Sequence, residues 1–221
     1  MLKLYRFETA SNERIKAILN KKIWLSKPSE FNDLNDCRIP ALYLPEMDLH
    51  TFHELKKIMN QIYPEDFDYS RSILSRKVIH NLKKYIENSE ENDTLKQILV
   101  GASNVTVIRN EITSKTGICC FFAGEINEPL LWAHYANKHT GFCVQYEFDE
   151  KANYGSMHPV NYMSKLYTPS VREFAFCPEE TLHKILTSKT IHWQYEKEYR
   201  LIELFAFNDG ENGKLIDIPD V

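Results

Sequence analysis

The chain has 221 residues, of which 43% are hydrophobic and 26% are charged, and it contains only seven glycines. This composition is typical of a globular protein and excludes a collagen-like or intrinsically disordered chain. The net charge of -4 at pH 7 gives no overall attraction to nucleic acid or anionic lipid, and only a local basic groove would provide one.

Two features of the sequence bear on the compartment. No basic segment followed by an apolar run opens the chain, and no apolar stretch reaches the roughly 18 residues of a membrane span. We therefore expect a cytoplasmic protein without a membrane partner. The five cysteines are an odd number, and three lie in apolar, strand-like stretches, which favours reduced core residues. No C-x-x-C pair is present, so no metal site is expected.

The N-terminal part of the chain predicts a strand, a helix, a second strand and a polar loop. Residues 2–7 have the length and aromatic content of a strand. Ser11 stands directly before residues 12–22, whose apolar positions recur at helical spacing, as expected for a capped helix. Residues 23–25 form a second short strand, and residues 26–36 are rich in turn formers.

The middle of the chain has a helical pattern. Two apolar stripes at helical spacing lie between about residues 51 and 100, in the densest run of exposed-type charges. We expect a helical insertion at about 45–105, packed against one sheet face within a single domain of residues 1–221.

The second half returns to strands separated by short helices. Its predicted strands are residues 118–122, 141–148, 159–162 and 195–205. Short helices are predicted around LLWAHYA and PEETLHKILTSK, the latter with acidic residues first and lysines late. The fold class is therefore α+β, with a mixed, largely antiparallel sheet.

One late segment brings charged residues together. Glu196 and Glu198 are two apart, so a strand would point both carboxylates to one face, followed there by Arg200. Two such carboxylates raise the pKa of one of them unless a cation lies between them, and can serve acid–base chemistry or stabilise an oxocarbenium ion. The alternative is a surface ladder of Glu and Arg at a sheet edge.

Arg6 follows Tyr5 on the first strand, on the same side as the apolar Leu2 and Leu4. A buried arginine needs an anionic partner. That partner is either Glu196 or Glu198, or a ligand phosphate, and the two alternatives stay open at this point.

The segment LWAHYANKHTGFC concentrates aromatic residues. Trp132, His134 and Tyr135 lie within one helical turn and could hold a planar ligand. Equally, Trp132 and Tyr135 could be core residues, with His134 at the helix surface. In the earlier loop, Asn32 and Asp33 most simply build an Asx turn.

Four segments, LYRF, WLSKPSEFND, LWAHYANKHTGFC and K-x-x-x-W-x-Y-E-x-E-Y-R, occur in an order that resembles the bacterial family DUF2971, a domain of unknown function. The resemblance spans most of the chain. Two departures accompany it: residues 34–37 replace a proline and an aromatic, and the chain is expected to be short at its C-terminus relative to the family.

The layout is also similar to that of the ADP-ribosyltransferase superfamily, which implies an ADP-ribosyltransferase-like fold. There a first-strand Arg holds a dinucleotide, an aromatic packs on the nicotinamide, and a late Glu within E-x-E assists cleavage of the N-glycosidic bond. The resemblance implies NAD as a substrate, with no further cofactor. The implied catalytic residues are Glu198, Glu196 and Tyr135, and the implied nucleotide-binding residues are Arg6, Tyr5, His134, Trp132 and Arg200.

A second hypothesis has no chemistry. The same aromatic and charged residues would form a regulatory module that binds a small ligand, a protein or a nucleic acid. A chain of net negative charge would have to concentrate its lysines locally to hold a phosphate backbone. The acceptor in the first hypothesis, whether protein or nucleic acid, is equally open.

Overall fold

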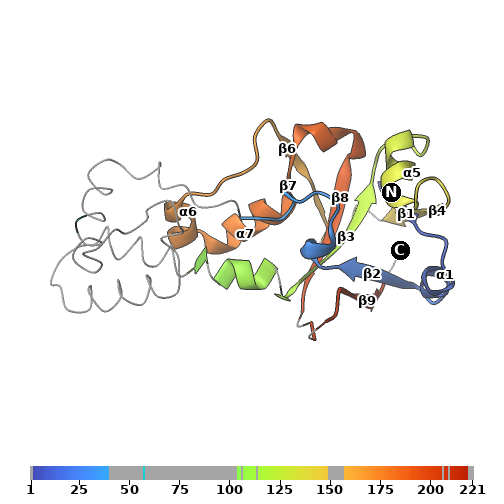
Figure 1. Cartoon of the computed structure of the whole chain (residues 1–221), viewed down its shortest axis with the longest axis horizontal. Coiled ribbons are helices and arrows are strands. Elements are labelled where there is room, and N and C mark those ends of the chain that lie inside the picture. The colour runs from blue at the N-terminus through green and yellow to red at the C-terminus, as the bar shows by residue number, and fades with distance from the viewer. Residues whose placement is uncertain are drawn as a thin grey trace. The chain divides into compact units, whose positions relative to one another are not determined.

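The computed structural model describes residues 2–39, 57, 104–105, 107–112, 114–148, 157–205, 207–208 and 210–218. The chain divides into two compact units (Figure 1). Unit 1 comprises residues 1–37, 111–167 and 186–221, and unit 2 comprises residues 38–110 and 168–185. The insertion expected at about 45–105 lies almost wholly outside the described residues, so it stays a prediction, as does the single domain.

Unit 1 is built on an antiparallel sheet, as expected for the predicted α+β class. Its strands are β1 (Leu2–Glu8), β2 (Lys22–Ser26), β3 (Thr116–Phe122), β4 (Phe142–Phe148), β5 (Met157–Pro159), β8 (Glu198–Leu204) and β9 (Gly213–Asp217). A separate parallel pair joins β6 (Asn161–Met163) to β7 (Ser188–Thr190). The mixed, largely antiparallel character is confirmed.

The sheet forks at β3. Strand β8 pairs with β3 along its full length and so occupies one of its two edges. The other edge is shared: β1 pairs at Phe122 and β2 pairs at Ile118. Strands β1 and β2 therefore diverge from the same strand (Figure 1). Backbone groups at such a divergence lack strand partners and need side-chain donors or acceptors.

Short helices connect the strands. They are α1 (Asn12–Leu19), α5 (Pro129–Tyr135), α6 (Val171–Phe176) and α7 (Pro178–Thr187), with the 3-10 helices η1 (Pro28–Glu30) and η3 (Ile191–Glu196). The predicted cap of α1 is confirmed, because the Ser11 hydroxyl accepts a hydrogen bond from the Arg14 backbone N–H at 3.2 Å. Helix α1 contacts β2, and α5 contacts β1.

Strand β3 supplies hydrophobic residues to two buried clusters. Phe121 packs with Phe148 in one cluster, and Phe122 packs with Phe7 and Leu131 in the other. Consecutive residues of a strand point to opposite faces, which explains why neighbours enter different cores. The second cluster fixes α5 against the sheet and so positions the aromatic residues of that helix.

The described part of unit 2 centres on α6 and α7. Ser170 and Glu173 form a reciprocal capping box at the start of α6. The Asn104 side-chain amide donates to the carbonyl of the buried Phe174 at 2.6 Å. All five cysteines are free, but Cys177 is exposed, so the expectation of core cysteines is wrong for that residue.

Two local predictions are corrected, and one strand was not predicted. The strand predicted at 195–205 begins only at Glu198, because the preceding residues form η3 and Lys197 has a left-handed φ of 44°. The strand predicted at 159–162 is two short strands, β5 and β6, in different sheets. Strand β9 had no counterpart among the predictions. Within the described residues, no helix combines the length and the apolar character of a membrane span.

Candidate functional site

A pocket of about 280 Å³ lies in unit 1. Its aromatic lining comes from Phe7 on β1, Phe31 after η1, Phe122 on β3, and His134 and Tyr135 on α5. Its charged lining falls mainly into two groups, which come from different elements. The first is Arg6, Glu8 and Arg14, named here the β1 arginine cluster, and the second is Asp36, Lys189 and Glu198. Glu30 on η1 also lines the pocket and belongs to neither group.

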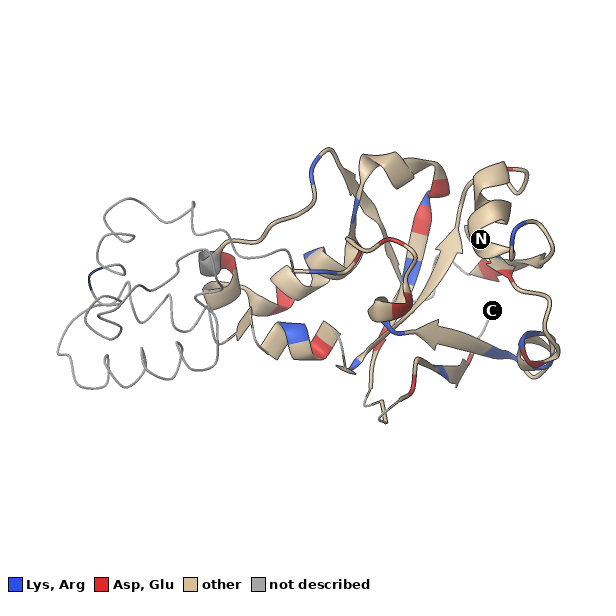
Figure 2. Ribbon diagram, viewed as in Figure 1, with Lys and Arg blue, Asp and Glu red and all other residues tan. Residues whose placement is uncertain are grey.

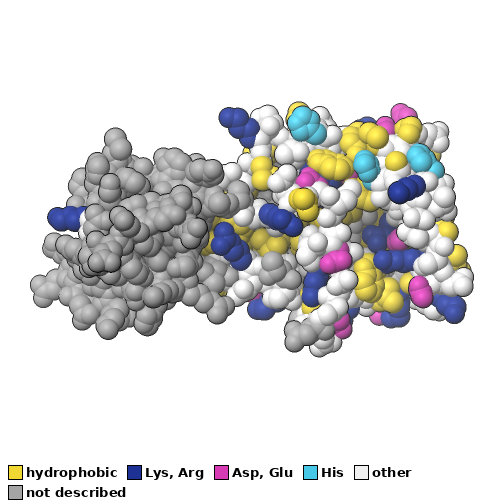
Figure 3. Space-filling model, viewed as in Figure 1, with side chains coloured by type: hydrophobic (Ala, Val, Ile, Leu, Met, Phe, Trp, Pro, Cys, Tyr) yellow, Lys and Arg dark blue, Asp and Glu magenta, His cyan; other side chains and the backbone are white. Residues whose placement is uncertain are grey.

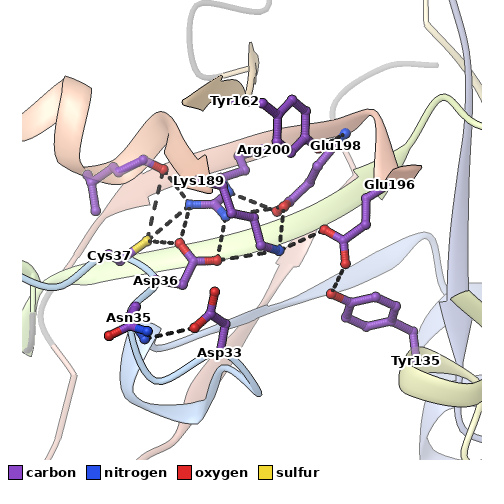
Figure 4. A network of polar contacts seen from close by, with 11 residues as sticks. Asp33, Asn35, Asp36, Cys37, Tyr135, Tyr162, Lys189, Glu196, Glu198 and Arg200 are labelled. Carbon is purple, nitrogen blue, oxygen red and sulfur yellow. Dashed lines mark hydrogen bonds and ion pairs between the residues drawn. The ribbon is translucent and has the colours of Figure 1, made fainter. Parts of the chain in front are cut away.

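The second group belongs to a larger set, the buried ion cluster (Figure 4). Its members are Asp36, Lys189, Glu196, Glu198 and Arg200, none of them more than 4% exposed. The set contains three acidic and two basic side chains. Burying charges is costly unless each is paired and hydrogen-bonded, so the contacts within this cluster decide its properties.

Arg200 on β8 holds two carboxylates. Its Nη1 and Nη2 donate to the two oxygens of Asp36 at 2.9 and 2.7 Å, and its Nε donates to Glu198 at 2.8 Å. Nη1 also donates to the Leu186 carbonyl at 2.7 Å. Arg200 thus ties the loop after η1 to β8 through a bidentate pair, the geometry in which Arg–carboxylate pairs are strongest.

Lys189 on β7 joins the other pair of acids. Its Nζ lies 2.7 Å from an oxygen of Glu196 and 3.1 Å from an oxygen of Glu198. The Asp36 carboxylate is 3.6 Å away, and the ring of Trp193 lies 4.6 Å from the same Nζ. Because Glu196 ends η3 and Glu198 begins β8, the two acids converge on Lys189 although they do not share a strand (Figure 4).

The two glutamates have opposite pKa shifts. Burial alone would raise the pKa of Glu198, but the adjacent cations Arg200 and Lys189 outweigh it and lower that pKa to about 2. Burial raises the pKa of Glu196 to about 7, against the opposing effect of Lys189. Glu198 is therefore an ionised carboxylate at neutral pH, whereas Glu196 titrates near neutrality.

Tyr135 connects the pocket to Glu196. Its hydroxyl donates to Glu196 Oε1 at 2.6 Å, and its ring packs on Phe122 with centroids 4.7 Å apart. Burial, followed by the negative charge of Glu196, raises the pKa of the phenol well above its ordinary value. Tyr135 is thus a protonated donor with a fixed ring plane at the pocket wall.

The β1 arginine cluster lies at the fork of the sheet. Arg6 donates from Nε to Glu8, and its Nη1 contacts the Cys119 sulfur. Arg6 also donates to the Cys120 carbonyl on β3 at 3.4 Å and to the Trp24 carbonyl on β2 at 3.2 Å. Of the two alternatives left open for the anionic partner of Arg6, the pairing with Glu196 or Glu198 is wrong, because Glu8 on the same strand pairs with Arg6.

The structure brings four of the eight predicted site residues to the pocket lining: Arg6, His134, Tyr135 and Glu198. Tyr5, Trp132, Glu196 and Arg200 are not among the lining residues. Trp132 donates to the Ile126 carbonyl at 2.6 Å and packs edge-on against Phe7. The alternative of a surface ladder is excluded for Glu196, Glu198 and Arg200, because all three are buried.

Sequence reasoning missed Asp36 and Lys189. Lys189 was interpreted as a late lysine of a helix, but α7 ends at Thr187 and Lys189 lies on β7. Lys189 is the first residue of the motif K-x-x-x-W-x-Y-E-x-E-Y-R, seven positions before Glu196, and this position was the signal that could have identified it. Asp36 was read only as a turn residue, and the neighbouring Asx turn is confirmed, since Asp33 accepts from the Asn35 N–H at 2.9 Å.

Charges elsewhere on unit 1 are interspersed. Acidic and basic residues lie close together on the ribbon of the sheet (Figure 2). On the described surface seen in Figure 3, Lys and Arg side chains are separated by acidic and hydrophobic ones, without a continuous basic stripe on that face. Among the described residues, no group of three or more His, Cys, Asp or Glu could hold a metal ion.

The segment that runs from within α5 to within β8 matches a family model. Residues 131–201 match the model of the family described as "Protein of unknown function (DUF2971)". The resemblance to DUF2971 is thereby confirmed over this segment, which contains Tyr135, Lys189, Glu196, Glu198 and Arg200. Neither the curated proteins nor the solved structures contain a match to this chain.

Proposed function

We propose that the pocket of unit 1 binds NAD through its nicotinamide nucleotide half and cleaves the N-glycosidic bond, in the manner of an ADP-ribosyltransferase. The observation that carries this proposal is Glu198, a buried carboxylate that lines the pocket and whose pKa is lowered to about 2. A carboxylate held ionised at a pocket wall suits a reaction that develops positive charge.

The chemistry follows from that charge. When the bond between the ribose C1′ and the nicotinamide nitrogen breaks, the electron pair leaves with nicotinamide and the ribose becomes an oxocarbenium ion. Water or an acceptor nucleophile then bonds to C1′ and loses a proton, which completes the reaction. A preorganised anion stabilises this ion without reorganising at the moment of reaction. Arg200 and Lys189 hold Glu198 in place but also oppose its field. Three acids against two bases leave the buried ion cluster net negative once Glu196 ionises.

The aromatic lining supports a planar leaving group. Tyr135 cannot rotate freely, because its hydroxyl is bonded to Glu196 and its ring packs on Phe122. His134 lies beside it, with ring centroids 6.2 Å apart. Such a wall offers a π-face to a nicotinamide ring, and stacking on aromatic faces is a general means of holding planar bases.

The test is nicotinamide release from NAD, followed by mass spectrometry with and without cell lysate as a source of acceptor. Glu198→Gln keeps the shape of the side chain and removes its charge, so we expect release to fall by at least about 100-fold, the loss typical for one electrostatic stabiliser. Glu203→Gln makes the same change on the same strand, away from the pocket lining, and should keep wild-type activity.

Two results would contradict the proposal. The first is full nicotinamide release by a Glu198→Gln variant that shows the wild-type circular dichroism spectrum. The second is a wild-type chain that releases no nicotinamide under either condition. The second result would favour a ligand-binding module without chemistry.

A further inference from the structure

Arg6 and Arg14 both line the pocket, but they differ in how far their guanidinium N–H groups are used in bonds within the chain. Arg6 is 9% exposed and makes four contacts as a donor, to Glu8, the Cys119 sulfur and the carbonyls of Cys120 and Trp24. These contacts satisfy backbone acceptors at the fork of the sheet. A ligand that took over the Arg6 guanidinium would leave those buried carbonyls without donors, at a cost comparable to the bonds it gained.

Arg14 presents the opposite case. It projects from α1 into the pocket lining, and its side chain is 32% exposed. Its Nε lies 3.8 Å from Glu8, beyond hydrogen-bonding distance, and no hydrogen bond among the described residues has its guanidinium as donor. The Trp24 ring supports the guanidinium, with the Arg14 carbon Cζ 5.1 Å from the ring centroid.

The local charge favours an anion at this point. Within the β1 arginine cluster, Arg6 and Arg14 carry two positive charges against the one negative charge of Glu8, and Glu8 already accepts from Arg6. The other charged lining residues, Glu30, Asp36, Glu198 and Lys189, are net negative, so the attraction for an anion is confined to this cluster. Thr9, next to Glu8 in the chain, also lines the pocket. A guanidinium with unused N–H groups binds phosphate oxygens in pairs, which gives both affinity and orientation.

We propose that Arg14 forms a phosphate subsite in the pocket and that Arg6 serves as a structural clamp of the fork. This rests on the proposed function, since it assigns the 5′-phosphate of the nicotinamide nucleotide to Arg14 and its ribose to Glu198. A volume of about 280 Å³, near the lower end for ligand pockets, suits a mononucleotide better than a whole dinucleotide.

The experiment compares two probes that differ by one phosphate, nicotinamide mononucleotide and nicotinamide riboside, by isothermal titration calorimetry on the full chain. Wild type should bind the mononucleotide about 10- to 100-fold more tightly, as expected for charge-assisted hydrogen bonds. Arg14→Gln should abolish this preference and leave riboside affinity unchanged. Lys16→Gln removes the same charge from the same helix, outside the pocket lining, and should keep the preference.

The outcomes separate this proposal from the proposed reaction. An Arg14-dependent preference in a chain that releases no nicotinamide would support the subsite and overturn the reaction. Nicotinamide release with an unchanged preference in Arg14→Gln would overturn the subsite alone. A wild type that binds both probes equally, or neither, would also overturn the subsite, as would equal losses in Arg14→Gln and Lys16→Gln.

Discussion

The β1 arginine cluster and part of the buried ion cluster line the same pocket, and the two clusters use their charges differently. In the buried ion cluster every charge is at most 4% exposed and is bonded to an opposite charge within the chain. In the β1 arginine cluster, Arg6 is equally committed, whereas Arg14 keeps a partly exposed guanidinium. The buried ion cluster therefore fixes the elements that it joins, whereas the β1 arginine cluster retains the Arg14 guanidinium, which can bind a ligand.

This difference has a physical origin. Desolvated charges must be paired, so the three residues of the buried ion cluster that line the pocket, Asp36, Lys189 and Glu198, are already bonded to opposite charges within the chain. Arg14 lies on α1, which has no buried residues, and its side chain is 32% exposed, so water can reach its N–H groups at little cost. A ligand displaces water from Arg14 more easily than it displaces a carboxylate from Arg200.

The largest effect is expected from Arg200→Met. This change leaves Asp36 and Glu198 buried with one cation fewer, so the free energy of unfolding at pH 7 should fall by about 3–5 kcal/mol, measured by urea denaturation. As a control, Lys22→Met breaks an exposed pair with Asp217 and should cost less than about 1 kcal/mol. Similar losses in the two variants would show that the cluster does not contribute in this way.

An intermediate effect is expected from pH. The pKa of Glu196 is raised to about 7 from 4.5, so the folded chain holds this proton more tightly than the unfolded one. Its contribution to stability is full below about pH 4.5 and is lost as pH rises through about 7, by on the order of 3 kcal/mol. The lowered pKa of Glu198 acts only in acid, where its contribution is lost as pH falls from about 4.5 to about 2.

Glu196→Gln tests this expectation through melting temperatures measured between pH 5 and 8. The wild-type melting temperature should decline across this range, and the variant should lose most of the decline. The slope is the readout rather than the absolute stability, because Tyr135 and Lys189 donate to different oxygens of Glu196 and glutamine replaces one of these oxygens by an NH2 donor. An unchanged slope in the variant would assign the pH dependence to another group.

The smallest effect is expected from Arg14→Gln in the absence of ligand. Its pair with Glu8 is long and partly exposed, so unfolding free energy should change by less than about 1 kcal/mol in urea denaturation. Arg6→Gln is the matched comparison and should cost about 2 kcal/mol or more, because two carbonyls at the fork lose a donor. Equal costs would contradict the division of roles between the two arginines.

Local patterns in the sequence were sufficient for most elements of unit 1. The Ser11 cap, the helix after it and the strands around Phe121 and Phe148 follow from hydrophobic periodicity and capping, which act over a few residues. The sequence also predicted that the carboxylates of Glu196 and Glu198 lie close together. It placed both residues on one strand, whereas Glu196 belongs to η3. The motif that contains them could be recognised because its residues are close in the chain.

Tertiary structure alone decided the partners of the charges. Asp36 meets Arg200 across 164 positions, and Arg6 meets the Trp24 and Cys120 carbonyls only because two strands diverge from β3. A left-handed Lys197 turns η3 into β8 and so brings Glu196 back to Lys189. Pairing between distant residues depends on strand order and burial, which no local pattern encodes, so the sequence named the charged residues and the fold determined which of them remain available to a ligand.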